Sequence, residues 1–282
     1  MTLQRILKIS RPRFWIYELG PYLLGLAATL PLLENPAVLL DVRIIAFFIY
    51  FLFPANLLIY GINDIFDYET DKLNPKKVAY ESLLMPAEHK YILIAVLLTT
   101  LPFVFFLDVS NIPSVIGFAA FIFFASFYSA SPIRAKTKPG FDMIFSAGHY
   151  VATGVFTYAL ISGVFPSALP IIGGMLWAMA MHAYSAVPDI DADKTSGIAT
   201  VATVLTKKPT LVMCTVFYIV SAIIAYTYIG AIAVLLLVPY LLLMIMSLNS
   251  SEEKLFKLYT YFPKLNTIVG MIVFWSIVFL RS

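Results

Sequence analysis

The chain has 282 residues, of which 61% are hydrophobic and only 12% are charged. A soluble domain carries about 25% charged and about 45–50% apolar residues, so this composition excludes a soluble protein and indicates a membrane protein with several spans. The net charge of +3 is too small to indicate nucleic-acid binding. The single Cys214 excludes both a disulfide framework and a cysteine metal site.

Apolar runs of roughly 17–25 residues are the length that a membrane-spanning helix needs. We expect an all-α integral membrane protein with one domain over residues 1–282. The N-terminal segment lacks a small-residue cleavage site, so the first span is expected to be retained. Nine runs qualify as transmembrane helices: 14–33, 43–62, 91–108, 112–129, 142–163, 166–187, 210–229, 231–248 and 265–281.

Lysine and arginine residues predict the orientation of these spans, because cytoplasmic loops carry an excess of them. They gather in the N-terminal segment and in the loops after the second, fourth, sixth and eighth predicted spans. Of the 19 lysine and arginine residues, only Arg43 and Arg281 lie elsewhere. We therefore expect a multi-pass protein of the cell membrane with a cytoplasmic N-terminus.

Two acidic segments lie on this basic side: "NDIFDYETD" (63–71) after the second span and "VPDIDADKTSG" (187–197) after the sixth. If the helices continue through them, polar residues three, four or seven positions apart share one face. Glu69 and Asp191 would point away from these faces and are expected to be solvated. The residues expected on the shared faces are Asn63, Asp64, Asp67, Asp71, Asp189 and Asp193.

Carboxylates gathered at a membrane edge repel one another, and a single acid at mid-bilayer costs ~2.5–3.5 kcal/mol. A divalent cation reverses this cost, and Mg²⁺ is usually held by one or two carboxylates together with substrate phosphates. We therefore predict that the two segments face each other and hold two or more Mg²⁺ ions around a diphosphate. Nearby cations would neutralise the remaining phosphate charge: Lys72, Lys76, Lys77, Arg134, Lys136 and Lys194.

The acidic segments also allow interpretations without a metal. An acidic loop beside a membrane is often a solvated surface, although two such loops on one side are less easily explained in that way. Carboxylates near a membrane also mark cation transporters and proton relays. A transporter is expected to carry its acids near mid-span, whereas these acids cluster at span ends. A non-catalytic accessory protein is a further alternative.

The two acidic segments also resemble a known family. "NDIFDYETD" matches the pattern NDxxDxxxD, and "DIDAD" matches DxxxD, which are the paired signatures of the UbiA superfamily of intramembrane prenyltransferases. The stretch "YSASPIRAKTKPGFD" (128–142) resembles the loop after the fourth span of that family. The resemblance covers essentially the whole chain and implies a bundle of nine helices around a central cavity. Residues 10–25, 63–77 and 184–205 are most similar to the lycopene elongase branch.

This resemblance implies transfer of a prenyl group from an allylic diphosphate, expected to be dimethylallyl diphosphate, at a site near the cytoplasmic face. Asn63 would orient the diphosphate. The expected acceptor is a lipophilic molecule from the bilayer, the end of lycopene or a related C40 carotenoid. Aromatic acceptors (hydroxybenzoate, homogentisate or naphthoate) and glyceryl phosphates are the alternatives. The implied Mg²⁺ ligands are Asp64, Asp67, Asp71, Asp189 and Asp193.

Four further side chains are candidates for the reaction itself. Tyr128 and Tyr184 lie next to the polar loops and are expected to line the substrate site, where an aromatic ring would stabilise an allylic cation. His149 and His182 are candidate bases for a late proton transfer, although a membrane histidine is more often a hydrogen-bonded packing residue. The few intramembrane cations favour an uncharged acceptor over a carboxylated one.

Overall fold

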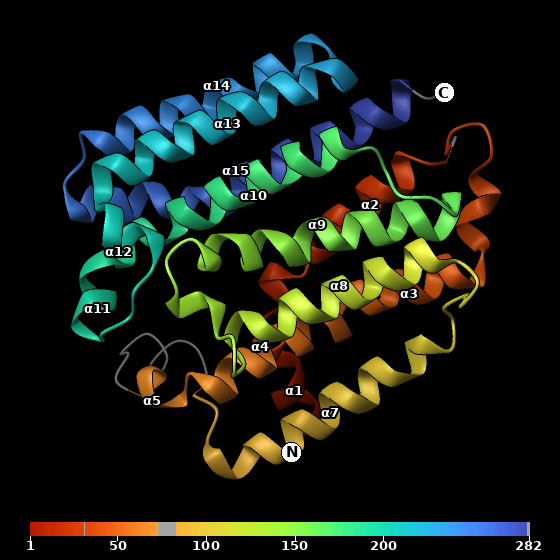
Figure 1. Cartoon of the computed structure of the whole chain (residues 1–282), viewed down its shortest axis with the longest axis horizontal. Helices are drawn as coiled ribbons and strands as arrows, with labels where there is room; N and C mark the ends of the chain where they lie inside the picture. Colours follow the sequence, from red (N-terminus) through yellow and green to blue (C-terminus); the bar gives the residue numbers. More distant parts are fainter. Residues whose placement is uncertain (31, 73–82, 281–282) are drawn as a thin grey trace.

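A computed structural model describes residues 1–30, 32–72 and 83–280, and every regular element in these ranges is a helix. The helices form an elongated bundle (Figure 1). Short 3₁₀ turns connect several of them. The α-helices are α1 (Leu3–Ile9), α2 (Ile16–Ala27), α3 (Val42–Leu52), α4 (Pro54–Phe66), α5 (Tyr68–Asp71), α7 (Pro86–Val104), α8 (Ile112–Ser129), α9 (Phe141–Ser162), α10 (Ala168–Ala186), α11 (Ile190–Thr195), α12 (Val201–Leu205), α13 (Lys207–Ile229), α14 (Ala231–Leu248) and α15 (Glu252–Leu280).

Within the described residues, seven helical segments are long and apolar enough to cross a membrane. They are α3 and α4 taken together, α7, α8, α9, α13, α14 and α15. The predicted first and sixth spans also form helices in the bundle, α2 and α10 (Figure 1). However, α2 has only 12 residues, and α10 carries His182, Tyr184 and Ser185 near its end. The predicted count of nine spans is therefore not confirmed.

The predicted second span is two helices rather than one. α3 ends at Leu52, and Phe53 has φ −125°. Pro54 then begins α4, where its missing N–H and fixed φ suit the first helical position. A second break occurs at Asp67, which ends α4 with φ −102° and ψ 1°. The continuous helix expected over residues 63–71 is thus wrong, because α5 begins anew at Tyr68.

Two hydrophobic clusters divide the bundle. One joins α2, α3, α4, α7, α8 and α9 and is rich in aromatic rings in edge-to-face contact, such as Phe47 and Phe156 with centroids 4.6 Å apart. The other joins α10, α12, α13, α14 and α15 and includes Tyr184, Tyr218 and Tyr240. Since α9 packs against α8, α10 and α2, it links the two halves and lies in the middle of the molecule (Figure 1).

The close contact between α2 and α9 depends on Gly25. A Cβ atom there would lie 2.7 Å from the Thr157 Cβ and 2.8 Å from the Gly154 carbonyl oxygen. We predict that Gly25→Val destabilises the protein by about 1–3 kcal/mol, because overpacking forces the two helices apart. Thermal unfolding in detergent should show a lower midpoint. Gly20→Ala on the same helix is the control, since no atom lies within 4 Å of its added Cβ; an equal loss in both variants would contradict the packing role of Gly25.

Candidate active site

The end of α4 carries two buried carboxylates, Asp64 and Asp67, each 4% exposed. Arg11, just before the 3₁₀ turn Pro12–Phe14, donates from Nη2 to Asp64 Oδ1 at 2.6 Å. Lys136, in the loop between α8 and α9, donates to Asp67 Oδ2. Arg134 Nη2 lies 3.6 Å from the other oxygen of Asp67. Such close cations are required, because an uncompensated buried charge is strongly destabilising.

Both arginines beside these carboxylates have an uncommon backbone conformation. Arg11 has φ 51° and Arg134 has φ 45°, in the left-handed region that residues other than glycine avoid. A residue held there costs of order 1–3 kcal/mol, and such residues cluster at functional sites. The chain thus accepts local strain at the two positions whose guanidinium groups lie beside the aspartates of α4.

The second acidic segment lies at the same end of the bundle, where α5 and α11 are found (Figure 1). Asp189 closes the 3₁₀ turn Val187–Asp189, and Asp193 lies on α11. Lys136 is close enough to both Asp64 and Asp193 to interact electrostatically with each. It therefore lies between the two acidic segments, which the fold brings together.

Burial dominates the electrostatics of this group. Desolvation and, to a smaller extent, the neighbouring Asp189 carboxylate raise the pKa of Asp193 to about 6, although Lys136 opposes the shift. Desolvation lowers the pKa of Lys136 to about 8 against the attraction of Asp64. Both shifts mean that the charged forms are held in a poorly hydrated place. A metal ion would be attracted to the carboxylate there, and a phosphate to the ammonium group, more strongly than in water.

The site is also suited to a metal ion and phosphate oxygens. Among the described residues, Asp67 Oδ1 and Arg134 Nε are buried without a hydrogen-bond partner. In the same part of the chain, no three acidic, histidine or cysteine side chains converge closely enough to hold an ion by themselves. Mg²⁺ is usually bound by one or two carboxylates while substrate phosphates and water complete its shell. The oxygen donors present therefore fit Mg²⁺ carried in with a diphosphate.

The other residues of the first motif are placed as follows. Asn63 accepts a hydrogen bond from Ser129 Oγ at 2.9 Å. Asp71, at the end of α5, is half-buried. Glu69 is exposed as predicted and pairs with the exposed Lys72, so in this structure Lys72 lies beside Glu69. The predicted roles of Lys76 and Lys77 lie outside the described residues.

The remaining candidates separate into two groups. Tyr128 is half-buried, contacts the His182 ring edge to face at a centroid distance of 5.9 Å, and interacts electrostatically with Asp193. It therefore lies near the second acidic segment. Tyr184 is fully buried, its hydroxyl lies 3.1 Å from Ser247 Oγ, and its ring packs on Phe262. This geometry favours a packing role for Tyr184. Asp191 is exposed as predicted, and so is Lys194.

Two residues of this region, Arg11 and Glu18, were not predicted from the sequence. Arg11 is one of several N-terminal cations, and nothing in the sequence distinguishes it from those that set orientation. Glu18 is 1% exposed and lies on α2. It is the only acid before position 33, inside the first predicted span, and an acid within a span is by default a candidate for function. Glu18 could therefore have been identified from the sequence as a candidate functional residue.

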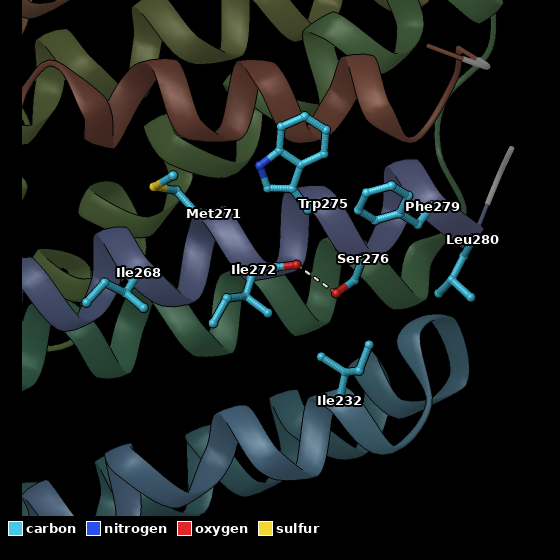
Figure 2. A pocket seen from close by; sticks show the side chains of 8 residues that line it. All are labelled: Ile232, Ile268, Met271, Ile272, Trp275, Ser276, Phe279 and Leu280. Atoms are coloured by element: carbon cyan, nitrogen blue, oxygen red, sulfur yellow. Dashed lines mark hydrogen bonds between the residues drawn. The ribbon is translucent and has the colours of Figure 1, made fainter. Parts of the chain in front are cut away.

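A groove of about 520 Å³ lies elsewhere and is lined by residues of α14 and α15. Figure 2 shows that its walls are apolar side chains such as Ile232, Ile268 and Trp275. The one hydroxyl there, on Ser276, donates to the Ile272 carbonyl oxygen at 2.7 Å. The groove contains no titratable group, so it has no chemistry for a diphosphate and is suited to contact with lipid chains.

Comparison with known proteins shows the family of the chain. A family model described as the UbiA prenyltransferase family matches residues 19–257. A lycopene elongase/hydratase from Halobacterium salinarum is 38% identical over 94% of this chain and 93% of its own length. A lycopene elongase/hydratase from Haloarcula japonica is 36% identical over 95% of this chain and 88% of its own.

Solved structures show the same fold. A UbiA homolog from Archaeoglobus fulgidus has been solved bound to DMAPP and Mg²⁺, with a TM-score of 0.65 and 21% identity, and bound to GPP and Mg²⁺, with a TM-score of 0.66 and 20% identity. Each comparison covers 96% of this chain and 99% of the other.

Proposed function

This chain belongs to the UbiA prenyltransferase family and is a multi-pass membrane prenyltransferase. From that premise, we propose that it transfers the dimethylallyl group of DMAPP to the end of lycopene or a related C40 carotenoid. The observation that carries this proposal is the half-buried Lys136, which contacts Asp67 and interacts electrostatically with both Asp64 and Asp193. The similarity to lycopene elongase/hydratases over nearly the whole chain supports the acceptor.

The donor diphosphate would bind at this end of the bundle. Asp64, Asp67, Asp71, Asp189 and Asp193 would hold two or more Mg²⁺ ions, whose charge stabilises the leaving diphosphate oxygens. The cations that lie beside these carboxylates would turn to the diphosphate, since Arg and Lys bind phosphate oxygens by charge-assisted hydrogen bonds. They are Arg11, Arg134 and Lys136. Asn63 is proposed to orient the donor.

The chemistry then requires one bond to break and one to form. Loss of diphosphate breaks the C–O bond and leaves an allylic cation, and the terminal C=C of the acceptor supplies the electron pair of the new C–C bond. Aromatic faces near the site stabilise such a cation. Tyr128 and Tyr60 are suitably positioned, since Tyr60 lies under the Arg11 guanidinium, 4.7 Å from its ring centroid. The product cation then loses a proton or takes up water.

We also propose that the domain covers residues 1–282, that α2 and α10 complete a nine-span bundle around a substrate cavity, and that the acidic end faces the cytoplasm. α10 packs against both α9 and α13, and α2 against α9 and α15, so each lies among segments that are themselves long enough to span a membrane. The acidic end of α4 pairs with Arg11 of the N-terminal segment and with Lys136 of the loop after α8. Because basic residues gather on the cytoplasmic side of membrane proteins, these pairs support a cytoplasmic position for this end of the bundle.

Purified protein with DMAPP and Mg²⁺ tests the acceptor directly, with lycopene, 4-hydroxybenzoate and homogentisate in parallel. We expect lycopene to gain one isoprenoid unit per modified end, with or without water, as measured by mass spectrometry. Excess EDTA should abolish the product and added Mg²⁺ should restore it. Turnover of an aromatic acceptor while lycopene stays unchanged would overturn the proposed acceptor.

The metal requirement should depend on pH. Metal binding needs the ionised Asp193 carboxylate, whose pKa is raised to about 6, so protons compete with Mg²⁺ below that pH. Lowering the pH from about 7 to about 5 should raise the Mg²⁺ concentration for half-maximal activity roughly tenfold for one such group. Mg²⁺ titrations at several pH values measure this. A requirement that is constant over the range would contradict the role of Asp193.

A further inference from the structure

A second buried polar group lies deeper in the bundle. Glu18 on α2 faces His149 on α9, with Glu18 Oε1 2.6 Å from His149 Nδ1. The other oxygen of Glu18 accepts a hydrogen bond from Thr153 Oγ1 at 2.9 Å. Glu18 is 1% exposed, His149 4% and Thr153 0%. His149 and Thr153 lie on α9, which is long and apolar enough to cross a membrane, and ionisable residues within such helices are rare and usually functional.

The pairing leaves one nitrogen of His149 available. When Nδ1 donates its hydrogen to the Glu18 carboxylate, Nε2 carries a lone pair and can accept a proton. Within the part of the chain that the structure describes, Nε2 makes no hydrogen bond. A carboxylate on the far side of the ring also stabilises the imidazolium that forms when Nε2 takes up a proton. The arrangement is that of an oriented general base.

The pair also lies next to the proposed donor site. Arg11 connects the two, because it binds Asp64 and lies over the Tyr60 ring, and Tyr60 is close enough to Glu18 to interact electrostatically. The Tyr150 ring packs on His149 at a centroid distance of 4.1 Å. His149 lies eight residues into α9, which is about 12 Å from the end of the helix. A reacting double bond held below the diphosphate would lie at this depth.

The other candidate base is less well placed. His182 lies near the end of α10, with Nε2 3.6 Å from Asp142 Oδ2. Asp142 itself accepts the backbone N–H groups of Gly140 and Val201, so its buried carboxylate fixes the loops on the diphosphate side. His182 interacts with Asp193 there. It therefore lies beside the proposed diphosphate site, whereas His149 lies about two turns beyond Asp142 on α9 and pairs with Glu18.

We propose that His149 is the base that ends the reaction and that Glu18 is its positioning residue; this rests on the proposed function. After the new C–C bond forms, the C–H bond beside the cationic carbon breaks. Its electron pair becomes a C=C bond, and the proton moves to Nε2 of His149. When water adds to the cation instead, the same nitrogen takes the proton from the bound water and a tertiary alcohol results. The imidazolium returns its proton to water before the next turnover.

His149→Phe and Glu18→Gln test this role, with Thr157→Val as the control two turns along α9. The Thr157 hydroxyl donates only to the Thr153 carbonyl oxygen among the described residues. General-base catalysis contributes about 10²–10⁴-fold, so His149→Phe should lower kcat for lycopene about a hundredfold. Mg²⁺-dependent DMAPP binding should stay within about twofold of wild type. Thr157→Val should keep wild-type kcat.

Glu18→Gln covers the case in which the phenylalanine variant does not fold. The amide keeps the shape and the oxygen that faces His149 but removes the charge, so kcat should fall about tenfold with the lycopene KM unchanged. The ratio of alkene to alcohol should also change in this variant, which a purely structural residue would not affect. Wild-type kcat and product ratio in both variants would overturn the proposal. DMAPP binding lost in step with kcat would also overturn it, in favour of a structural role. Wild-type protein that makes no prenylated lycopene would instead overturn the proposed function.

Discussion

Replacing Asp67 with asparagine should lower prenyl transfer by about a thousandfold, the upper end of the range for loss of one group that stabilises a developing anion. Asp67 is buried at the end of α4, and its Oδ1 has no hydrogen-bond partner among the described residues. Asparagine keeps the size and one oxygen but removes the charge that a Mg²⁺–diphosphate requires. Diphosphate release and prenylated product should fall together in an assay with DMAPP and Mg²⁺.

Glu69→Gln is the matched control. It removes one carboxylate only two residues away, but Glu69 is exposed and pairs with Lys72. Its activity should stay within about twofold of wild type, since exposed ion pairs contribute little. Equal losses in Asp67→Asn and Glu69→Gln would indicate a general effect of local charge. Full activity of Asp67→Asn would remove this residue from the site.

Lys136→Met should lower kcat/KM for DMAPP about a hundredfold. The ammonium group contacts Asp67 and interacts with both Asp64 and Asp193, so it interacts with both acidic segments. Methionine keeps the length of the side chain but leaves buried carboxylates without that charge, both in the free protein and around the diphosphate. Steady-state kinetics at saturating Mg²⁺ would measure the loss.

Lys138→Met controls for the loss of one positive charge in the same loop. Lys138 is exposed, and it lies outside the group of cations that contact the aspartates, so DMAPP kinetics should stay within about twofold of wild type. Lys136→Arg should recover part of the activity, because it restores the charge in a different shape. A Lys136→Met variant that binds and uses DMAPP normally would contradict the position of Lys136 between the two segments.

The acidic segments illustrate what could be predicted from sequence. Their polarity within an apolar chain indicated a charged ligand, and helical spacing correctly separated the buried Asp64 and Asp67 from the exposed Glu69 and Asp191. The separation of buried from exposed acids was correct because the direction of a side chain over one helical turn depends on local geometry alone. Asp67 ends the helix in the structure, so the spacing argument holds from Asp64 to Asp67, whereas the exposure of Glu69 depends on the new helix α5.

Contacts between distant segments could not be predicted in the same way. Glu18 and His149 are separated by 131 positions, and no periodicity in one segment identifies its partner in another. Arg11 binds Asp64 from a strained conformation, which propensities disfavour. Tyr184 was selected for its place beside a polar loop, but its ring points into the core against Phe262. These positions depend on how the helices pack.

The most direct test of the central claim is a structure of the protein with Mn²⁺ in place of Mg²⁺ and a thiolo analogue of DMAPP that ionises slowly. Anomalous scattering would locate the metal ions independently of the protein. We predict metal and diphosphate between Asp64 and Asp67 on one side and Asp189 and Asp193 on the other, with Lys136 turned to the phosphate oxygens. A diphosphate bound elsewhere, or metal ions that contact only one of the two acidic segments, would contradict the account.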